Sequence, residues 1–183
     1  MKKHITILVL LILLGVGVTS SFSSGDPKYI FKVIKEALRS PDGESPPTVQ
    51  NDKRVGEPCP KIVLKNIRTN KMADLNEMIK GKVTVIIFMQ TSNAGSRRAL
   101  EKMNTALETY PELNVVAICV DAGSPARILK YIEHHKFPFT FLHDPKFTIP
   151  ELFGYSYTPT AAVIGKDGKV IYLDRWAYWE IDG

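Results

Sequence analysis

Cysteine is scarce in this chain. Its 183 residues include only Cys59 and Cys119, which form no Cys-x-x-Cys pair and have no spacing typical of a metal site. The histidines form no recognisable ligand set either, because His134 and His135 are neighbours that would point apart on a helix, and His143 stands apart from both. We therefore predict no metal site and no cofactor.

A strong excess of charge and an internal repeat are also absent. The formal net charge is +5, and 44% apolar and 23% charged residues are ordinary for a globular protein. Nothing in this balance indicates a nucleic-acid partner. Without a repeated unit, a solenoid or a propeller is excluded, and a single domain with one core is expected.

The apolar run at the N-terminus is too short for a permanent membrane anchor. Residues 5–18 follow two lysines and precede a small, polar segment, as in a secretory signal, whereas a spanning helix needs roughly 18 to 20 apolar residues. We predict that residues 1–23 are a signal peptide and that the mature protein is periplasmic or extracellular. A retained signal would be its only contact with a membrane. No cysteine follows the run, so lipid modification is not predicted.

Residues 24–54 are predicted to hold a short amphipathic helix and a linker. Asp26 and Pro27 supply an N-cap and a first-turn proline, and apolar residues then recur on one face to about residue 39. Five prolines between residues 40 and 60 indicate a linker. We expect the helix to dock on the main domain, with contact to a partner as the alternative.

Residues 55–183 are predicted to form an α/β domain. The strand, helix and strand pattern from residue 83 to residue 120 predicts two parallel neighbours, and Asp167-Gly168 predicts a tight hairpin. A mixed sheet of about five strands with helices on both faces accounts for the pattern. Strands are expected near residues 61–66, 83–89, 115–120, 139–142, 160–165 and 169–173, and helices after Asp74, from about Ala94, after Ser124 and around residues 149–154.

The junction after the strand at 83–89 is the candidate functional corner. A helix that begins at about Ala94 directs unpaired amides and a partial positive charge toward the preceding loop, where a cysteine would become a reactive thiolate. The sequence has Ser92, Asn93 and Ser96 instead. Either Ser92 or Asn93 is expected to cap the helix.

Several motifs occur in a fixed order along this domain. They are Gly56-Glu57-Pro58-Cys59-Pro60, the segment from Leu75 to Val83, the corner from Phe88 to Arg98, Tyr157-Thr158-Pro159-Thr160 and the hairpin Lys166-Asp167-Gly168-Lys169. In their order and spacing the chain resembles the exported thioredoxin-fold thiol oxidoreductases of the TlpA and ResA type, which lie beside the AhpC/TSA peroxiredoxins. The resemblance covers about residues 55–174 and implies a thioredoxin-like fold.

The resemblance also implies which residues form the site. Asn93 and Ser96 take the positions of the attacking and resolving cysteines, and an amide and a hydroxyl cannot perform disulfide exchange. The resemblance further implies a cis peptide bond before Pro159, with a backbone edge that pairs with bound peptide. We therefore predict a protein without redox activity that binds a peptide or protein partner in the cell envelope. The binding residues would be Ser92, Asn93, Ser96, Arg97, Thr158 and Pro159.

The alternative is an enzyme, either a thiol-disulfide oxidoreductase or a thiol peroxidase, that acts through Cys59, Cys119 or both. Cys119 lies in a predicted buried strand, whereas Cys59 lies in a proline-flanked loop and is expected to be more exposed. One buried structural thiol and one loop thiol, or a disulfide between the two, are the other interpretations.

Two further features stay open at this stage. Arg97 in the first helical turn opposes the helix dipole, which indicates a solvated face or, alternatively, an anion site. After the hairpin, residues 175–183 are too few for the long closing helix that the resemblance implies. We expect Trp176 and Trp179 to cover the sheet in a shorter way, a truncated chain being the alternative.

Overall fold

The structure is a computed structural model that describes residues 54–175. The predicted signal peptide, the amphipathic helix, most of the linker and the two tryptophans lie outside these residues. The described elements are β1 (Val63–Asn66), β2 (Met72–Asp74), α3 (Leu75–Ile79), β3 (Thr84–Met89), α4 (Ala94–Thr109), β4 (Asn114–Cys119), α5 (Pro125–His135), β5 (Thr140–His143), α6 (Thr148–Leu152), β6 (Thr160–Ile164) and β7 (Val170–Arg175).

The strands form one mixed sheet in the order β2-β1-β5-β4-β3-β6-β7. Strands β3, β4 and β5 are parallel, whereas β6 and β7 continue the sheet in antiparallel fashion. The sheet has seven strands and not about five: the six expected strand ranges all belong to it, and β2 is added at its edge through pairing with β1. Strand β2 is only three residues long and exists through its pairing with β1, so periodicity could not reveal it.

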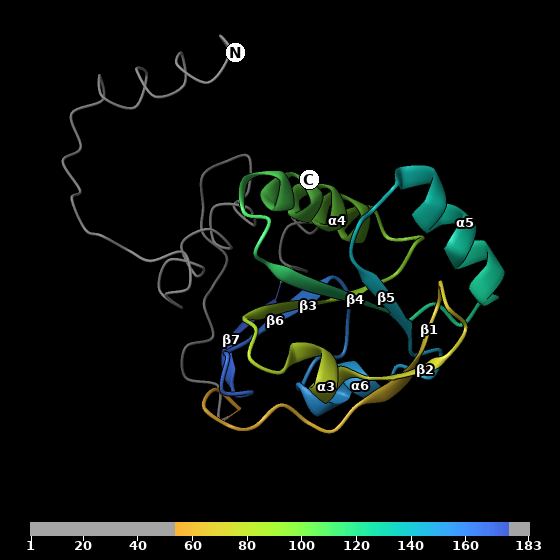
Figure 1. Cartoon of the computed structure of the whole chain (residues 1–183). Coiled ribbons are helices and arrows are strands. Elements are labelled where there is room, and N and C mark those ends of the chain that lie inside the picture. Colours follow the sequence, from red (N-terminus) through yellow and green to blue (C-terminus); the bar gives the residue numbers. More distant parts are fainter. Residues whose placement is uncertain (1–53, 176–183) are drawn as a thin grey trace, which may run out of the picture.

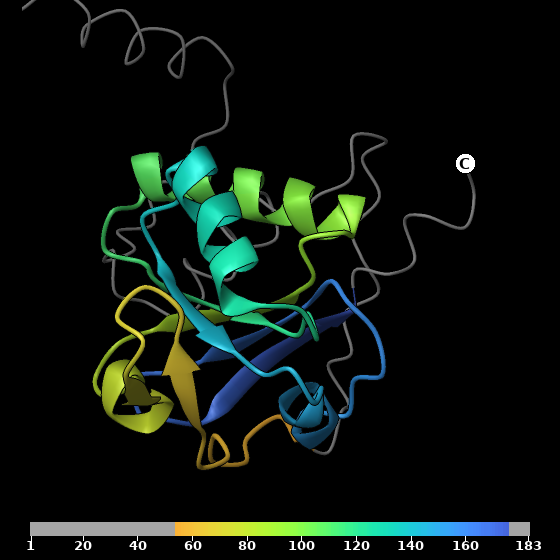
Figure 2. The ribbon, with the colours of Figure 1, turned by 90° about the vertical axis from the view of Figure 1, so that its right-hand side faces the viewer.

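Helices cover both faces of the sheet, as predicted. Figure 1 shows α4 and α5 on one side and α3 and α6 on the other, and Figure 2 shows α4 running across the sheet with α5 in front of it. The sheet therefore separates two apolar cores. All six residues of β3 are buried, which explains why this strand has no polar face.

Aromatic packing joins the central strand to the segment around α6. Phe88 of β3 lies with its ring centroid 5.3 Å from that of Phe153 and 5.8 Å from that of Tyr155. Tyr155 also donates its hydroxyl to the carbonyl of Ala161 at 2.8 Å. Each such buried ring contributes about 1.5 to 3 kcal/mol. This packing fixes the loop that precedes β6 against the end of β3.

The register of the sheet places the corner. Met89 and Cys119, the last residues of the parallel strands β3 and β4, are paired, and Phe88 pairs with Thr160, the first residue of β6. The loop before α4, the residues after β4 and Thr158-Pro159 therefore meet at one end of the sheet. The hairpin of Gly165 to Lys169 lies at the opposite end.

Candidate functional site

Asn93 caps helix α4 in the way that its position predicts. It is the N-cap residue, and its Oδ1 accepts a hydrogen bond from the backbone N–H of Ser96 at 2.8 Å. Ser92, the other predicted cap, is exposed and makes no cap. A negatively charged atom at position 93 would accept the same hydrogen bond and would also be stabilised by the positive end of the helix dipole.

The same asparagine reaches across to the loop before β6. Its Nδ2 donates to the carbonyl oxygen of Thr158 at 3.3 Å, and Thr158-Pro159 is a cis peptide bond, as the resemblance implies. Four predicted site residues, Asn93, Ser96, Thr158 and Pro159, therefore come together at one corner. Asn93 bridges its two halves.

Gln90 completes the corner and was not identified from the sequence. Its backbone N–H donates to Oγ of Ser96 at 3.2 Å, and its Oε1 accepts from the hydroxyl of Thr158 at 3.1 Å. Ser96 has no exposed surface. Its hydroxyl is therefore a structural group inside the corner and is poorly placed to attack a substrate.

Arg97 folds back over the loop. Its Nη1 donates to the carbonyl oxygens of Thr91 and Ser92, both at 3.3 Å. Through these two hydrogen bonds the guanidinium orders the turn between β3 and α4. Arg97 therefore fits neither a fully solvated face nor an anion site, because its side chain is half-buried and bound to backbone oxygens.

Asp121, just beyond β4, is the polar centre behind the corner. Its carboxylate accepts from the backbone N–H of Thr91 at 2.8 Å and from the Thr91 hydroxyl at 3.0 Å, and it also accepts from Sγ of Cys119 at 2.8 Å. Arg127 of α5 lies 4.0 Å from it. The sequence could have indicated this contact, because Thr91 and Asp121 follow two strands predicted to be parallel neighbours, and the carboxyl ends of such strands lie side by side.

Neither thiol faces the corner. Cys119 has no exposed surface, and Cys59 is 6% exposed, so Cys59 is the more exposed of the two, as expected, but it is buried as well. Cys59 is buried because its N–H donates to the carbonyl of Gly168 at the far end of the sheet, and Asn76 closes over its own carbonyl. The two thiols are free and belong to different cores, so they form no disulfide.

Burial also makes both thiols unreactive. It raises the pKa of Cys59 from its ordinary 9.0 to about 11. It raises the pKa of Cys119 further, and the hydrogen bond from its thiol to Asp121 adds to the effect. Since the thiolate is the nucleophile, both groups are held in the inert form at neutral pH.

The histidines are spread over the domain. His143 contacts the carbonyl oxygen of Asp121 through Nε2 at 2.9 Å, and His134 and His135 lie in the last turn of α5. Between residues 54 and 175 no group of three or more potential ligands is close enough to hold a metal ion. No helix in the same range is long and apolar enough to cross a membrane.

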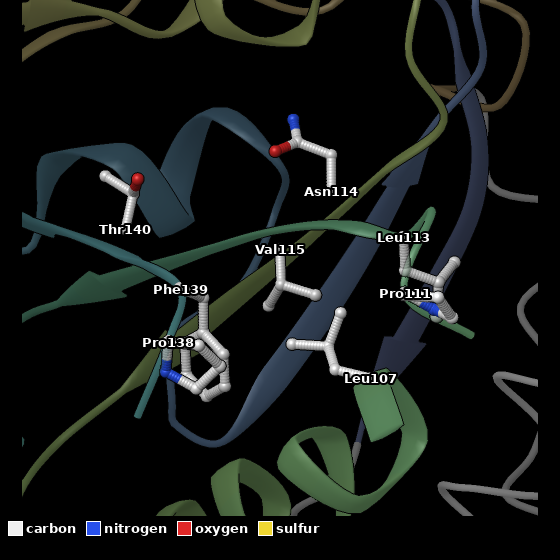
Figure 3. Close-up of a pocket in the computed structure, with 8 residues that line it drawn as sticks. All are labelled: Leu107, Pro111, Leu113, Asn114, Val115, Pro138, Phe139 and Thr140. Carbon is white, nitrogen blue, oxygen red and sulfur yellow. The ribbon is translucent and has the colours of Figure 1, made fainter. Parts of the chain in front are cut away.

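A pocket of about 380 Å³ lies at the other end of the sheet from the corner (Figure 3). Its wall is mainly apolar, and the Asn114 amide donates to the carbonyl of Met78 and to the hydroxyl of Thr84. Without convergent polar groups it does not resemble a catalytic site. The lining residues are Leu107, Pro111, Leu113, Asn114, Val115, Pro138, Phe139 and Thr140.

Comparison with known proteins agrees with the fold. The pattern of the AhpC/TSA family matches residues 55–173. A thioredoxin-like protein of Haemophilus influenzae is 27% identical over 128 residues, which cover 68% of this chain and 74% of that protein.

Solved structures agree as well. A putative thiol:disulfide interchange protein DsbE from Chlorobium tepidum is 27% identical, with a TM-score of 0.59 over 70% of this chain and 91% of that one. A putative thioredoxin from Neisseria meningitidis is 25% identical, with a TM-score of 0.56 over 63% of this chain and 77% of that one.

Proposed function

The chain belongs to the AhpC/TSA family, and from this membership we propose that it is an exported thioredoxin-like protein that binds a peptide segment of a partner without redox chemistry. The observation that carries the proposal is the double role of Asn93. One end of its amide caps α4 through Ser96, and the other end bonds Thr158. The corner keeps its shape with an amide where the resemblance places a thiol.

The backbone beside Pro159 supplies the binding edge. An extended peptide pairs with such an edge through main-chain hydrogen bonds, which need no thiol. Within residues 54–175, the carbonyl of Thr158 accepts only the 3.3 Å hydrogen bond from Asn93, a side chain that is half-buried. An N–H of an incoming peptide can therefore replace the asparagine amide at a small cost in free energy.

The chemistry of the corner argues against an enzyme. Disulfide exchange and peroxide reduction both require an accessible thiolate, and the groups in the corner are an amide and hydroxyls. The Cys119 thiol donates a hydrogen bond to the Asp121 carboxylate, which lies between it and Thr91, and Cys119 has no exposed surface. The location that fits a signal peptide on residues 1–23 is the periplasm or the exterior.

Binding can be tested with an unfolded polypeptide that lacks thiols, such as reduced and carboxymethylated α-lactalbumin. Asn93→Asp keeps the capping oxygen but removes the donor to Thr158, so it frees the edge. We expect the affinity to rise about fivefold, the equivalent of one hydrogen bond of about 1 kcal/mol. The measurement is the titration of the backbone amide NMR signals of residues 93, 157, 158 and 160.

The matched control is Asn104→Asp, the same change further along α4. It should leave the affinity unchanged. Binding that shifts signals elsewhere, or an equal response to both variants, would contradict the proposed site. Reduction of insulin or consumption of peroxide by the unaltered protein, at the rate of a Cys-x-x-Cys enzyme, would contradict the proposed function itself.

A further inference from the structure

One edge of the sheet has an open row of peptide groups. Figure 1 shows β2 and β7 at opposite sides of the sheet, and among the strands of residues 54–175 β2 pairs with β1 alone. The Asn66 N–H donates to the carbonyl of Lys71 at 2.8 Å. Because alternate residues turn their peptide groups to the same side of an antiparallel strand, the N–H groups of Met72 and Asp74 point away from β1. This outer side of β2, the β2 edge, can pair with one more strand.

Two exposed apolar side chains lie beside the β2 edge. Val63 is 46% exposed and Met72 is 65% exposed, and Leu152 of α6 is the only other exposed large apolar side chain in residues 54–175. Met72 pairs with Lys65, which is two residues from Val63 in β1, so these three side chains point to one face of the hairpin. The face offers apolar contact area next to the open N–H groups.

The charge around this face is positive. From residue 61 to residue 72 the chain has four basic residues and no acidic residue. The three lysines at positions 61, 65 and 71 are exposed, whereas the Arg68 guanidinium donates to two carbonyl oxygens of the segment before β5. The next carboxylates along the chain are Asp74, which accepts the N–H of Asn76, and Glu77. A partner with negative charge is therefore favoured at this face.

A second copy of the chain and its other segments fit the β2 edge poorly. Two copies paired edge to edge would bring the same lysines together, and such lysines protect edge strands from self-association. Residues 27–39 carry four basic side chains and one acidic side chain. Residues 176–183 are acidic but follow β7, six strand intervals or about 29 Å from β2, and their last carboxylate, seven residues beyond Arg175, reaches at most about 25 Å.

From these observations we propose that the β2 edge binds an extended, acidic segment of a partner protein, at a surface separate from the corner of Asn93 and Pro159. The incoming strand pairs with the open peptide groups of β2 through main-chain hydrogen bonds and lays an apolar side chain on Val63 and Met72. Its carboxylates lie near the three lysines. The lysines that keep two copies apart therefore select the partner. The directed N–H groups favour a peptide over a lipid surface, because the carbonyls of a strand match their spacing.

The probe is a nine-residue peptide of alternating glutamate and valine, compared with a peptide that has lysine in place of glutamate. We expect the glutamate peptide to shift the backbone amide NMR signals of Met72 and Asp74, and the lysine peptide to shift neither. Lys65→Glu with Lys71→Glu should weaken binding roughly tenfold, since attractive pairs become repulsive. The affinity comes from the same titration.

The matched control is Lys166→Glu with Lys169→Glu, the same change of charge at exposed positions in the hairpin beside the opposite edge. It should leave the affinity unchanged. Met72→Ala and Met72→Pro separate the side chain from the backbone, because both remove the thioether and only proline removes the outward N–H. Proline, which edge strands tolerate, should bind the peptide about fivefold more weakly than alanine.

Equal binding by both charge variants would overturn the proposal, and so would amide shifts at the corner in place of the β2 edge. Binding of phosphatidylglycerol vesicles without binding of the peptide would assign the lysines to a membrane and overturn it as well. Asp42→Lys with Glu44→Lys should leave the affinity for the peptide unchanged. A gain in affinity there would assign the β2 edge to the linker of the chain itself.

Discussion

Asn93 shows how much one side chain can determine at this corner. Its Oδ1 and Nδ2 make two hydrogen bonds, one to the helix and one to the loop before β6. An amide has no charge for the helix dipole to stabilise. The consequence is a corner that an uncharged amide holds together.

The two cysteines give a prediction at the same scale. Both should resist alkylation by iodoacetamide at neutral pH while the protein is folded, because they are buried and protonated. Both should react in urea. Mass spectrometry after labelling measures this directly, with the unfolded protein as the control. Rapid labelling of either thiol in the native state would contradict the burial that the structure assigns to it.

Single residues were predictable where the cause is local. The helix starts after Asp74 and Ser124, and a cap at Ser92 or Asn93, follow from residue type, and the structure has Asp74, Asn93 and Ser124 as N-caps. The burial of Cys59 was not predictable, because its cover is the hairpin around Gly168, more than a hundred residues along the chain. Gln90 was missed for the same reason, since its partner is Thr158.

At the scale of elements, the N-terminus of α4 offers backbone amides and the positive end of the helix dipole, which lower the pKa of a thiol placed there. Asn93→Cys with Ser96→Cys should therefore yield a first thiol with a pKa below its ordinary range, and measurable insulin reduction. The matched control is Glu101→Cys with Asn104→Cys, which has the same spacing in the middle of the helix and should stay slow. A folded corner variant without activity would contradict the placement of the two family cysteines at positions 93 and 96.

Asp121 joins the loop before α4 to strand β4 and should matter for stability. Asp121→Ala removes both carboxylate oxygens and leaves the part-buried Thr91 N–H without its acceptor, with a cost of about 1 to 3 kcal/mol. Urea denaturation measures the loss. Asp167→Ala, which removes one exposed hydrogen bond in the hairpin, should change the free energy of unfolding by less than about 1 kcal/mol. Equal losses in both variants would refute a special role for Asp121.

At the scale of the whole molecule, the buried thiols make stability depend on alkaline pH. The Cys59 pKa is about 11 in the folded chain, against 9.0 ordinarily, so the folded protein binds more protons between these values. The contribution of Cys59 to the free energy of unfolding is therefore fully present below pH 9 and is lost as the pH rises toward 11. Cys119 shifts in the same direction.

The test is the free energy of unfolding at several values between pH 7 and pH 11. Cys59→Ala should flatten the decline relative to the unaltered protein, whatever its effect at pH 7. Cys119→Ala serves as the second variant. If the slope is the same in both variants and in the unaltered protein, the thiols do not cause the decline.

The overall architecture was predictable because the sequence patterns that indicate it extend over many residues. The apolar run of β3 and the amphipathic pattern of α4 define the parallel unit, and Asp167-Gly168 defines the hairpin. The edge strand β2 and the network around Asp121 depend on contacts distant in sequence, which no local pattern records. That Asn93 and Thr158-Pro159 lie at one corner could be predicted, whereas the hydrogen bonds between them could not.

The point at which the chain enters the fold has a consequence for orientation. Gly56 and Cys59 bond to the hairpin at Val170 and Gly168, at the end of the sheet opposite Asn93 and Pro159. A domain attached to a surface through its N-terminus would turn the hairpin end toward that surface. The corner would then point outward, open to clients that approach from the surrounding medium.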